Sequence, residues 1–539
     1  MAIIENRIDT TGPKFAANRD AMLSLVEEAQ TLKEKVALRS AAGKARFHAR
    51  GQILPRERVA LLLDRGSPWL DLCPLAGYRM HDDDGKDNIM GGGIVAGIGF
   101  VAGVRAIVSA SDSAVKGGTI APMGLKKNLR VQQIARENKL PFFHLVESGG
   151  ANLLYQAEIF VEGGRGFANQ ARLSAMGVPQ ITVVHGSSTA GGAYLPGLSD
   201  YVIMIKGRAK VFLAGPPLLK AATGEIATDE ELGGAEMHVG VSGVGDLIAE
   251  DDADGIRLAR EVLAKLRWND ALPMQTERTF NVPRYPIDDL LGIVPVDYRR
   301  PYDVRQVIAR LVDDSDFLDF KPDYGPETVT GQAAIEGYPL GIIGNNGPID
   351  AAGAAKAAQF IQLCCQAGMP ILYLQNTTGY MVGREAERAG IVKHGSKMIQ
   401  AVANATVPQL TLHIGASFGA GNYGMCGRAF DPRFIFAWPN NRVAVMGGEQ
   451  AARVLAIVSE EKLRRAGQAV DRERLAAMER EIIARTDRES AALYATARLW
   501  DDGIIDPRDS RKILGFCLAT CDEAARRRLN PNTFGVARM

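Results

Sequence analysis

The chain contains an internal duplication, and this feature limits its fold more than any other. Three landmarks recur in the same order: an apolar segment after a proline, a second apolar segment after Val-Pro, and a glycine-rich turn, TAGGAY or FGAGNY. The matched positions are Pro141 and Pro370, Pro179 and Pro408, and Tyr194 and Tyr423, and all three pairs have the same offset of 229 (370 − 141, 408 − 179 and 423 − 194). Because a fixed period indicates repeated structural units, we predict two copies of one fold.

Each copy has the pattern of an α/β domain. A two-stranded hairpin is followed by a helix (residues 121–138 and 351–367), a buried strand, a second helix (166–176 and 396–405) and a second buried strand. The proline-led strands are apolar without alternation, which is typical of parallel strands covered on both faces. We therefore predict an α/β chain of two tandem domains.

The domain prediction assigns residues 1–275 to an N-terminal domain and residues 276–539 to a C-terminal domain. The segment 269–289 is rich in proline and polar residues, as linkers are. Helical extensions are expected at residues 16–42, where the pattern is amphipathic, and at residues 449–500, where charged residues dominate.

Composition excludes several classes of protein. In 539 residues the chain has 63 basic and 62 acidic side chains and 58 glycines, so it is neither a disordered chain nor a strongly basic nucleic-acid binder. It has six cysteines without a CxxC pair and seven histidines without HExxH spacing, so no metal site is expected. We found no secretory signal and no long uncharged apolar run, which favours a soluble protein of a reducing compartment, with no membrane partner.

The glycine-rich turns suggest a chemistry. In both copies they stand where a buried strand ends and a helix begins, and a helix N-terminus offers free N–H groups. Two turns per copy could each supply one N–H, and two converging donors form an oxyanion hole. The turns match neither GxGxxG nor GxxxxGK[ST] nor GxSxG, which disfavours a nucleotide phosphate loop and a serine hydrolase. No nucleophile or base is evident, so the base is expected to come with a cofactor.

Several side chains near these turns have two interpretations. His185 and His413, expected just after the second strand of each copy, are either core residues or supports of the site. His144 and Glu147 flank SGGA and are either catalytic or buried at a strand end. Lys116 and Lys220 either hold an anionic ligand or lie on a solvated surface.

At these motifs the chain resembles the carboxyltransferase (beta) subunits of biotin-dependent acyl-CoA carboxylases over nearly its whole length. The resemblance is carried by SGGAN (148–152), TAGGAY (189–194), FLAGPPLLKAATGE (212–225), GGAEMH (233–238), GNNGPI (344–349), QNTTGYMVG (375–383), GAGNYGMCGRA (419–429) and WPNNRVAVMGGEQAA (438–452). QNTTGYMVGRE and AGNYGMCGRA look like the methylcrotonyl-CoA and geranyl-CoA branch. GVARM and HGSSTAGGAYLPGLSDY look more like geranyl-CoA carboxylase.

The resemblance implies two crotonase-like domains of the ClpP/crotonase superfamily, with two oxyanion holes. The first would hold the acyl-CoA thioester oxygen, with donors from Ala151 and from Gly191 or Gly192. The second would hold the biotin ureido oxygen, with donors from Gly379 or Tyr380 and from Gly419 or Ala420. Further residues implied for the biotin side are Thr378 and Phe418, and for the acyl-CoA side Gly150, Ala190, Lys220, Asn345 and Asn346.

The resemblance also implies the reaction and the partners. Carboxybiotin would give CO2, its ureido nitrogen would take the γ-proton of a branched 2-enoyl-CoA, and the carbanion would capture the CO2. The chain has no MKM-type biotin attachment motif and no ATP-grasp region. A separate biotin-bearing alpha subunit that uses ATP and Mg is therefore implied, with a ring of six beta subunits, an α6β6 holoenzyme, active sites shared between neighbouring beta subunits, and a place in the bacterial cytoplasm, in leucine or terpene catabolism.

Three alternatives stay open at this point. The first is a 3-methylcrotonyl-CoA carboxylase beta subunit proper. The second is the carboxyltransferase of a biotin-dependent decarboxylase, and the third is a stand-alone crotonase-type hydratase or isomerase, which would need no biotin.

Overall fold

The computed structural model describes residues 2–81, 89–273 and 278–536, and these residues form two units. The N-terminal unit comprises residues 31–275, 497–499 and 520–539, and the C-terminal unit comprises residues 1–30, 276–496 and 500–519. Relative to the predicted ranges, the two ends of the chain are exchanged between the units. The long first helix, α1 (Pro13–Ala41), contributes residues to both. The assignment of acyl-CoA to the N-terminal domain and of biotin to the C-terminal domain stays a prediction.

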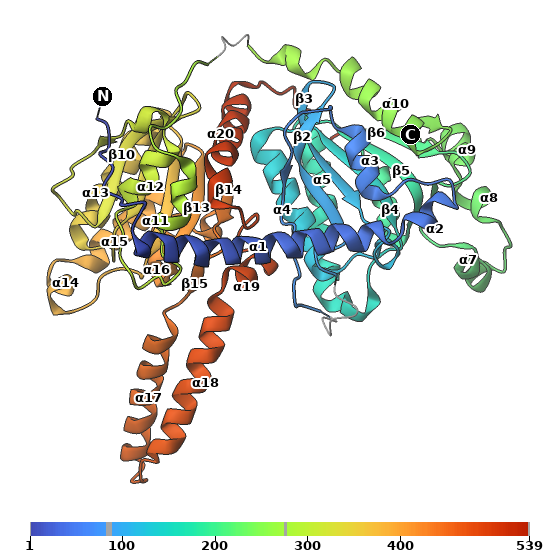
Figure 1. The fold of residues 1–539 in the computed structure, drawn as a ribbon. Helices are drawn as coiled ribbons and strands as arrows, with labels where there is room; N and C mark the ends of the chain where they lie inside the picture. The colour runs from blue at the N-terminus through green and yellow to red at the C-terminus, as the bar shows by residue number, and fades with distance from the viewer. Residues whose placement is uncertain (1, 82–88, 274–277, 537–539) are drawn as a thin grey trace. The chain divides into compact units, whose positions relative to one another are not determined.

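The N-terminal unit is built on one mixed sheet (Figure 1). Its strand order is β1-β2-β3-β4-β5-β6-β8, with β7 paired to β5; β1, β2 and β3 are antiparallel neighbours and the remaining pairs are parallel. The strands are β1 (Leu70–Asp71), β2 (Ile94–Val101), β3 (Val104–Ser111), β4 (Phe142–Ser148), β5 (Gln180–Thr189), β6 (Tyr201–Ile205), β7 (Lys210–Phe212) and β8 (Leu247–Ala249). The helices of this unit are α2 (Lys44–His48), α3 (Pro55–Leu62), α4 (Pro122–Asn138), α5 (Gln156–Ala175), α6 (Tyr194–Gly197), α7 (Pro216–Thr223), α8 (Asp229–Gly233), α9 (Ala235–Met237) and α10 (Asp252–Lys265).

The C-terminal unit repeats this plan. Its strand order is β14-β13-β12-β11-β10-β9, with β15 paired to β13. The strands are β9 (Leu318–Asp319), β10 (Thr328–Ile335), β11 (Tyr338–Asn345), β12 (Ile371–Thr377), β13 (Gln409–Phe418), β14 (Phe434–Ala437) and β15 (Arg442–Ala444). The helices are α11 (Leu290–Ile293), α12 (Val304–Leu311), α13 (Ala351–Gln366), α14 (Arg384–Arg388), α15 (Ile391–Ala403), α16 (Gly419–Gly424), α17 (Gly448–Arg465) and α18 (Arg472–Ser490). Two further helices, α19 (Ala492–Ala497) and α20 (Ser510–Arg526), contribute residues to both units.

The constant offset between the copies is preserved in the structure. β4 and β12, β5 and β13, and α4 and α13 all begin at the offset of 229 (371 − 142, 409 − 180 and 351 − 122). The hairpins β2–β3 and β10–β11 have an offset of 234 (328 − 94), and the corresponding strands β6 and β14, which pair with β5 and β13, have an offset of 233 (434 − 201). The predicted duplication into two parallel-sheet α/β domains is therefore confirmed, and the length differences fall before and after a central block.

Local sequence explains the elements that carry the central block. β4 and β12 are largely buried and begin with apolar residues after a proline, which has no N–H for a sheet ladder and therefore stands at a strand's start. α4 begins with Pro122 at its first turn and ends at Lys139 in the left-handed region (φ 51°). α13 begins where the Asp350 carboxylate accepts a hydrogen bond from the Gly353 amide at 2.6 Å.

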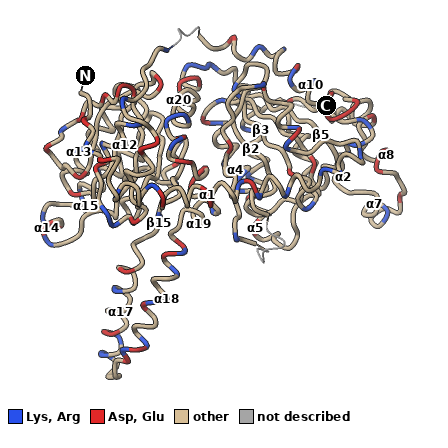
Figure 2. The backbone as a smooth tube through the Cα atoms, viewed as in Figure 1, with Lys and Arg blue, Asp and Glu red and all other residues tan. Residues whose placement is uncertain are grey.

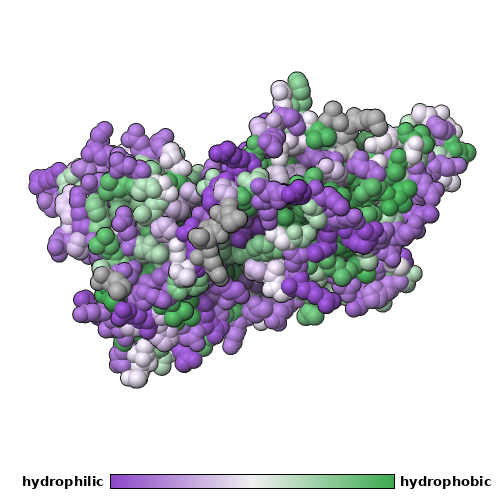
Figure 3. Space-filling model, turned by 90° about the horizontal axis from the view of Figure 1, so that it is seen from above, coloured by the Kyte–Doolittle hydropathy of each residue, from purple (hydrophilic) through white to green (hydrophobic). Residues whose placement is uncertain are grey.

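The apolar cores lie against the sheets. In the N-terminal unit, Val59 and Leu62 of α3 and Ile256 of α10 pack on strand residues such as Phe143 and Val183. In the C-terminal unit, α13 and α15 pack on β11 and β12. The α17–α18 hairpin differs, because it is rich in charged side chains along its length (Figure 2) and few of its residues are buried. The face in Figure 3 shows apolar patches among hydrophilic residues.

Candidate active site

The first candidate donor is the amide of Ala151, just beyond the end of β4. Ile120 forms a parallel bridge with Ala151: the Ile120 amide donates to the Gly150 carbonyl (2.9 Å), and the Asn152 amide donates to the Ile120 carbonyl (3.0 Å). Alternate amides of an extended segment point to opposite sides, so the Ala151 N–H points away from Ile120. Within the described residues it has no acceptor. The Gly150 amide, in contrast, donates to Ser148 Oγ at 3.1 Å.

The second copy reproduces this arrangement at the equivalent positions. Ile349 bridges Tyr380, with the Ile349 amide donating to the Gly379 carbonyl (2.9 Å) and the Met381 amide donating to the Ile349 carbonyl (2.8 Å). The Gly379 amide donates to Thr377 Oγ1 at 3.2 Å. The prediction left Gly379 and Tyr380 as alternatives, and the geometry favours Tyr380, because the amide of Gly379 is already used.

The second candidate donor of each pair lies at a helix N-terminus. The turn Ala190–Ala193 follows β5 and α16 follows β13, so the first amides of each are not used within the helix. Gly191 and Ala420 are exposed, whereas Gly192 and Gly421 are buried. The first residue of each turn, Ala190 or Gly419, has a positive φ (51° and 55°). Gly191 and Ala420 are therefore the better-placed donors.

The two turns of each copy lie against each other. A β-carbon on Gly150 would stand 3.7 Å from the Thr189 carbonyl oxygen, and one on Gly379 would stand 3.5 Å from the Phe418 carbonyl oxygen. The pairing of β4 with β5 and of β12 with β13 has the same register irregularity, between Val146 and Ser148 in one copy and between Gln375 and Thr377 in the other. Each copy thus places an Ala151-type amide next to a helix N-terminus, as an oxyanion hole requires.

A charged network supports the first site. Arg58 Nη1 of α3 donates to the Glu147 carboxylate at 2.8 Å, and Ser113 Oγ donates to the same carboxylate oxygen at 2.8 Å. Arg58 Nη2 also reaches Asp252 at 3.5 Å, and Asp252 accepts from His185 Nδ1 at 2.8 Å. Burial lowers the pKa of His185 to about 4, so this imidazole is neutral at pH 7. Burial opposes ionisation of Asp252, yet its hydrogen bond with His185 and the charge of Arg58 bring its pKa to about 2.

Neutral amides support the second site. Asn376 stands where the first copy has Glu147; its Oδ1 accepts from the Ala416 amide, and its backbone amide donates to Asn345 Oδ1, both at 3.3 Å. Gln375 donates to the Met425 carbonyl at 2.5 Å and accepts from the Ser417 hydroxyl. The Gln375 side chain is fully buried. The second pair of turns is therefore held without an ion pair among these contacts.

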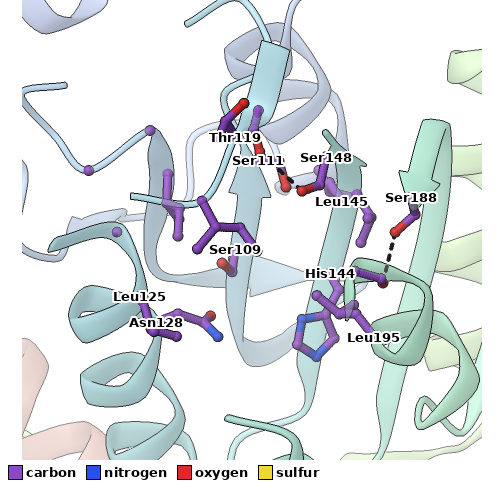
Figure 4. Close-up of a pocket in the computed structure, with 18 residues that line it drawn as sticks. Ser109, Ser111, Thr119, Leu125, Asn128, His144, Leu145, Ser148, Ser188 and Leu195 are labelled. Atoms are coloured by element: carbon purple, nitrogen blue, oxygen red, sulfur yellow. Dashed lines mark hydrogen bonds between the residues drawn. The ribbon is translucent and has the colours of Figure 1, made fainter. Parts of the chain in front are cut away.

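A cavity of about 90 Å³ lies behind the first site (Figure 4). Ser148, Ser188 and Gly192 line it on the side of the turns, and His144 and Asn128 line it from β4 and α4. Burial lowers the pKa of His144 to about 3, so its ring is neutral, and its Nε2 has no hydrogen-bond partner among the described residues.

The remaining predicted residues lie as follows. Thr378 is exposed beside Gly379, whereas Phe418 is buried and packs edge-on against Tyr298. Lys220 is exposed on α7, and Lys116 is exposed in the turn before α4. Their roles stay predictions.

Asn345 and Asn346 have structural bonds in the C-terminal unit. Asn345 is fully buried and receives the Asn376 amide, while Asn346 accepts from the Val304 amide at 2.8 Å. These contacts leave less of either side chain for a ligand, and their part in acyl-CoA binding stays a prediction.

The histidine prediction needs one correction of position. His185 and His413 lie within β5 and β13 rather than after them, and both are buried. His413 Nδ1 contacts the Asn441 side chain at 3.2 Å. Both side chains are therefore supports inside the fold and are not exposed to a ligand. Across the described ranges, no cluster of three or more His, Cys, Asp or Glu side chains could hold a metal ion, and no helix combines the length and apolarity that a membrane crossing needs.

Sequence reasoning missed the residues that fix the turns. Ser148 and Thr377 occupy equivalent positions of the two copies and have the same role, so an alignment of the copies could have found them. Arg58 and Asp252 lie far from Glu147 along the chain, one before it and one after it, and no local pattern marks them.

Comparisons with known proteins agree with this geometry. The carboxyl transferase domain family matches residues 46–535. A beta subunit of geranyl-CoA carboxylase from P. aeruginosa is 60% identical in sequence, with a TM-score of 0.94 and full coverage of both chains. A probable biotin-dependent acyl-CoA carboxylase beta2 subunit from Mycobacterium tuberculosis is 49% identical, covering 98% of this chain and 99% of its own length. A probable methylcrotonoyl-CoA carboxylase beta chain from Drosophila melanogaster is 46% identical, covering 100% of this chain and 95% of its own length.

The fold, the two matched pairs of turns and these similarities agree along nearly the whole chain. The resemblance inferred from the motifs is thereby confirmed. The chain belongs to the carboxyl transferase family and is the carboxyltransferase (beta) subunit of a biotin-dependent acyl-CoA carboxylase.

Proposed function

We propose that this subunit carboxylates the γ-carbon of geranyl-CoA in preference to 3-methylcrotonyl-CoA. The observation that carries the proposal is the difference in similarity: 60% identity to a geranyl-CoA carboxylase beta subunit, against 46% to a probable methylcrotonoyl-CoA carboxylase beta chain. The alternative is a 3-methylcrotonyl-CoA carboxylase beta subunit.

The first pair of turns is the proposed site of the acyl thioester. The amides of Ala151 and Gly191 would donate to the thioester oxygen, where negative charge develops when the γ-proton leaves and the charge delocalises through the double bond. Gly192 lies behind them, and Ser148 fixes the backbone through the Gly150 amide. The loss of one such donor typically slows a reaction 10²–10³-fold.

The second pair of turns is the proposed site of biotin. Its donors would be the amides of Tyr380 and Ala420, with Gly419 and Thr378 beside them. The exposed Ala420 at a helix N-terminus, together with the Tyr380 amide that has no acceptor among the described residues, fits a carbonyl-type ureido oxygen. Bound carboxybiotin supplies the carboxyl group and the base, which agrees with the absence of an evident base in the turns.

The partner and the assembly belong to the same proposal. Biotin would be carried on a separate alpha subunit, which would use ATP and Mg, because this chain has no MKM-type attachment motif. A ring of six beta subunits, an α6β6 holoenzyme, active sites shared between neighbouring beta subunits, the bacterial cytoplasm and a role in terpene or leucine catabolism stay predictions. The mass of the purified complex in solution tests the assembly.

The substrate is tested by comparing kcat/KM for the two CoA esters. The assay uses the chain with its biotin-bearing partner, ATP and labelled bicarbonate. Geranyl-CoA has five more carbons, and burial contributes up to about 0.8 kcal/mol per CH2, so a preference of tenfold or more is expected. Equal or higher kcat/KM with 3-methylcrotonyl-CoA would overturn the preference. Equal rates with acetyl-CoA would overturn the branch, and enoyl-CoA turnover by the chain alone would favour a stand-alone hydratase or isomerase.

A further inference from the structure

The Arg58–Glu147 ion pair lies directly behind the first pair of turns. Glu147 is the residue before Ser148, whose hydroxyl fixes the Gly150 amide. The Arg58 side chain is 1% exposed and that of Glu147 is 16% exposed. Besides Arg58, the Glu147 carboxylate accepts from Ser113 Oγ at 2.8 Å and from Gln52 Nε2 at 3.3 Å. The carboxylate is therefore held on several sides at the end of β4.

The charges of this cluster cancel. Arg58 lies between the carboxylates of Glu147 (2.8 Å) and Asp252 (3.5 Å), and Arg208 reaches Asp252 at 3.8 Å. His185, on the other side of Asp252, is buried and neutral at pH 7. Two cations thus face two anions. Burying an ion pair costs desolvation energy. Removing one partner is strongly destabilising, because it leaves the other charge buried without compensation.

The second copy shows that the fold does not need this pair. Asn376 occupies the position of Glu147 and holds its turn through neutral hydrogen bonds. In the first copy a carboxylate, that of Glu147, stands one residue before Ser148 at the end of the strand that leads to the proposed oxyanion site. An unpaired carboxylate there would repel the charge of that oxyanion in a region of low dielectric.

We propose that Arg58 is a positioning residue for carboxyl transfer: it neutralises the Glu147 carboxylate and so keeps the surroundings of the Ala151 amide favourable for a developing oxyanion. The proposal rests on the proposed role of Ala151. Glu147 is not the base in this scheme. Its carboxylate is engaged by Arg58, Ser113 and Gln52, and it holds the end of β4.

The test uses the holoenzyme with Arg58→Met, Glu147→Gln and the double variant. Arg58→Met leaves the carboxylate unpaired, so kcat should fall roughly 30–300-fold with KM for the acyl-CoA changed less than about threefold. Glu147→Gln removes the repelling charge together with its partner's bond, so a smaller loss of about 3–10-fold is expected. The kcat of the double variant should be at least about tenfold higher than that of Arg58→Met, because neither the Glu147 carboxylate nor the Arg58 guanidinium then remains without its partner.

The pH profile separates charge from packing. The charged or titratable groups that face Glu147 and its cluster are Arg58, His185, Arg208 and Asp252. In Arg58→Met, lower pH protonates the unpaired carboxylate, so kcat should rise relative to the wild type as the pH is lowered. Arg208→Met is the matched control: it also removes a cation from Asp252 but none from Glu147, and it should keep the wild-type profile.

Two results would overturn the proposal. One is a double variant no more active than Arg58→Met; the other is an Arg58→Met profile that parallels the wild type. If Arg58→Met does not fold, Arg58→Lys keeps the charge and loses the two-pronged geometry, and it should retain kcat within about tenfold and the wild-type profile. A 100-fold loss in a folded Arg58→Lys protein would then overturn it. Failure of the proposed function would look different, because the wild-type complex itself would fix no bicarbonate on an acyl-CoA.

Discussion

The two pairs of glycine-rich turns share a backbone and differ in what stands behind it. In the N-terminal unit the support is charged: Glu147 is paired with Arg58 and bound by Ser113. In the C-terminal unit the same position is Asn376, whose Oδ1 accepts from the Ala416 amide and whose backbone amide donates to Asn345 Oδ1. The backbone bridges Ile120–Ala151 and Ile349–Tyr380 are nevertheless equivalent.

A length difference accompanies this difference in charge. The first copy is longer from Ser111 to Ile120 than the second is from Asn345 to Ile349, because the offset falls from 234 (345 − 111) to 229 (349 − 120). The extra segment contains Ser113, which binds Glu147. The comparison teaches that the amide geometry was kept in both copies, while the side chains that hold it were free to diverge.

The largest contrast is expected between Gly421→Ala and Gly192→Ala. A β-carbon on Gly421 would stand 2.8 Å from Gly379 Cα, so the two turns of the second site would be forced apart. On Gly192 the nearest atom is Ser188 Oγ at 3.5 Å, an ordinary contact. Gly421→Ala should therefore lower kcat of carboxyl transfer by about 10²–10³-fold, and Gly192→Ala by less than about tenfold. Equal losses would mean that the two sites are packed alike, and thermal unfolding of both variants controls for misfolding.

A smaller effect is expected when a carboxylate like that of Glu147 is introduced at the equivalent position of the C-terminal unit. Asn376→Asp introduces a carboxylate where the partner of the present side chain, the Ala416 amide, offers no countercharge. We expect a loss of about 1–3 kcal/mol in the free energy of unfolding near pH 7. The folded state would raise the pKa of this new carboxyl group, so the loss should shrink as the pH is lowered and the group is protonated. Urea unfolding at several pH values measures this, and a loss independent of pH would contradict it.

The smallest and most symmetrical effect is expected for the two hydroxyls that fix the turns. Ser148→Ala and Thr377→Val each remove the acceptor of one glycine amide, at 3.1 Å and 3.2 Å. Each should cost about 1 kcal/mol of stability. Ser187→Ala, at an exposed position of β5, is the control and should change stability by less than about 0.5 kcal/mol. A large difference between Ser148→Ala and Thr377→Val would break the equivalence of the two turns.

Much of this architecture could be predicted from the sequence, because its decisive signals are local or periodic. The repeat is visible in matched prolines and glycines, and both sites lie at the strand ends where those glycines stand. The preference for the Tyr380 amide over the Gly379 amide as a candidate donor could not be predicted. It depends on the hydrogen bond from the Gly379 amide to Thr377 Oγ1, which the backbone conformation just beyond β12 creates. The role of Arg58 could not be predicted for another reason: its partner Glu147 is distant along the chain, and no local sequence pattern marks a buried ion pair.

The constant spacing also sets limits on how such a chain can evolve. From Ile120 to Tyr194, and from Ile349 to Tyr423, the two copies have the same length, whereas the offset differs just before this block (345 − 111 = 234) and just after it (434 − 201 = 233). An insertion inside this block would carry one donor away from the other. Outside this block, a longer loop changes the surroundings of the two donor amides but not the spacing between them. The two copies therefore predict that insertions are accepted at the borders of this block and disrupt the pair of donors within it.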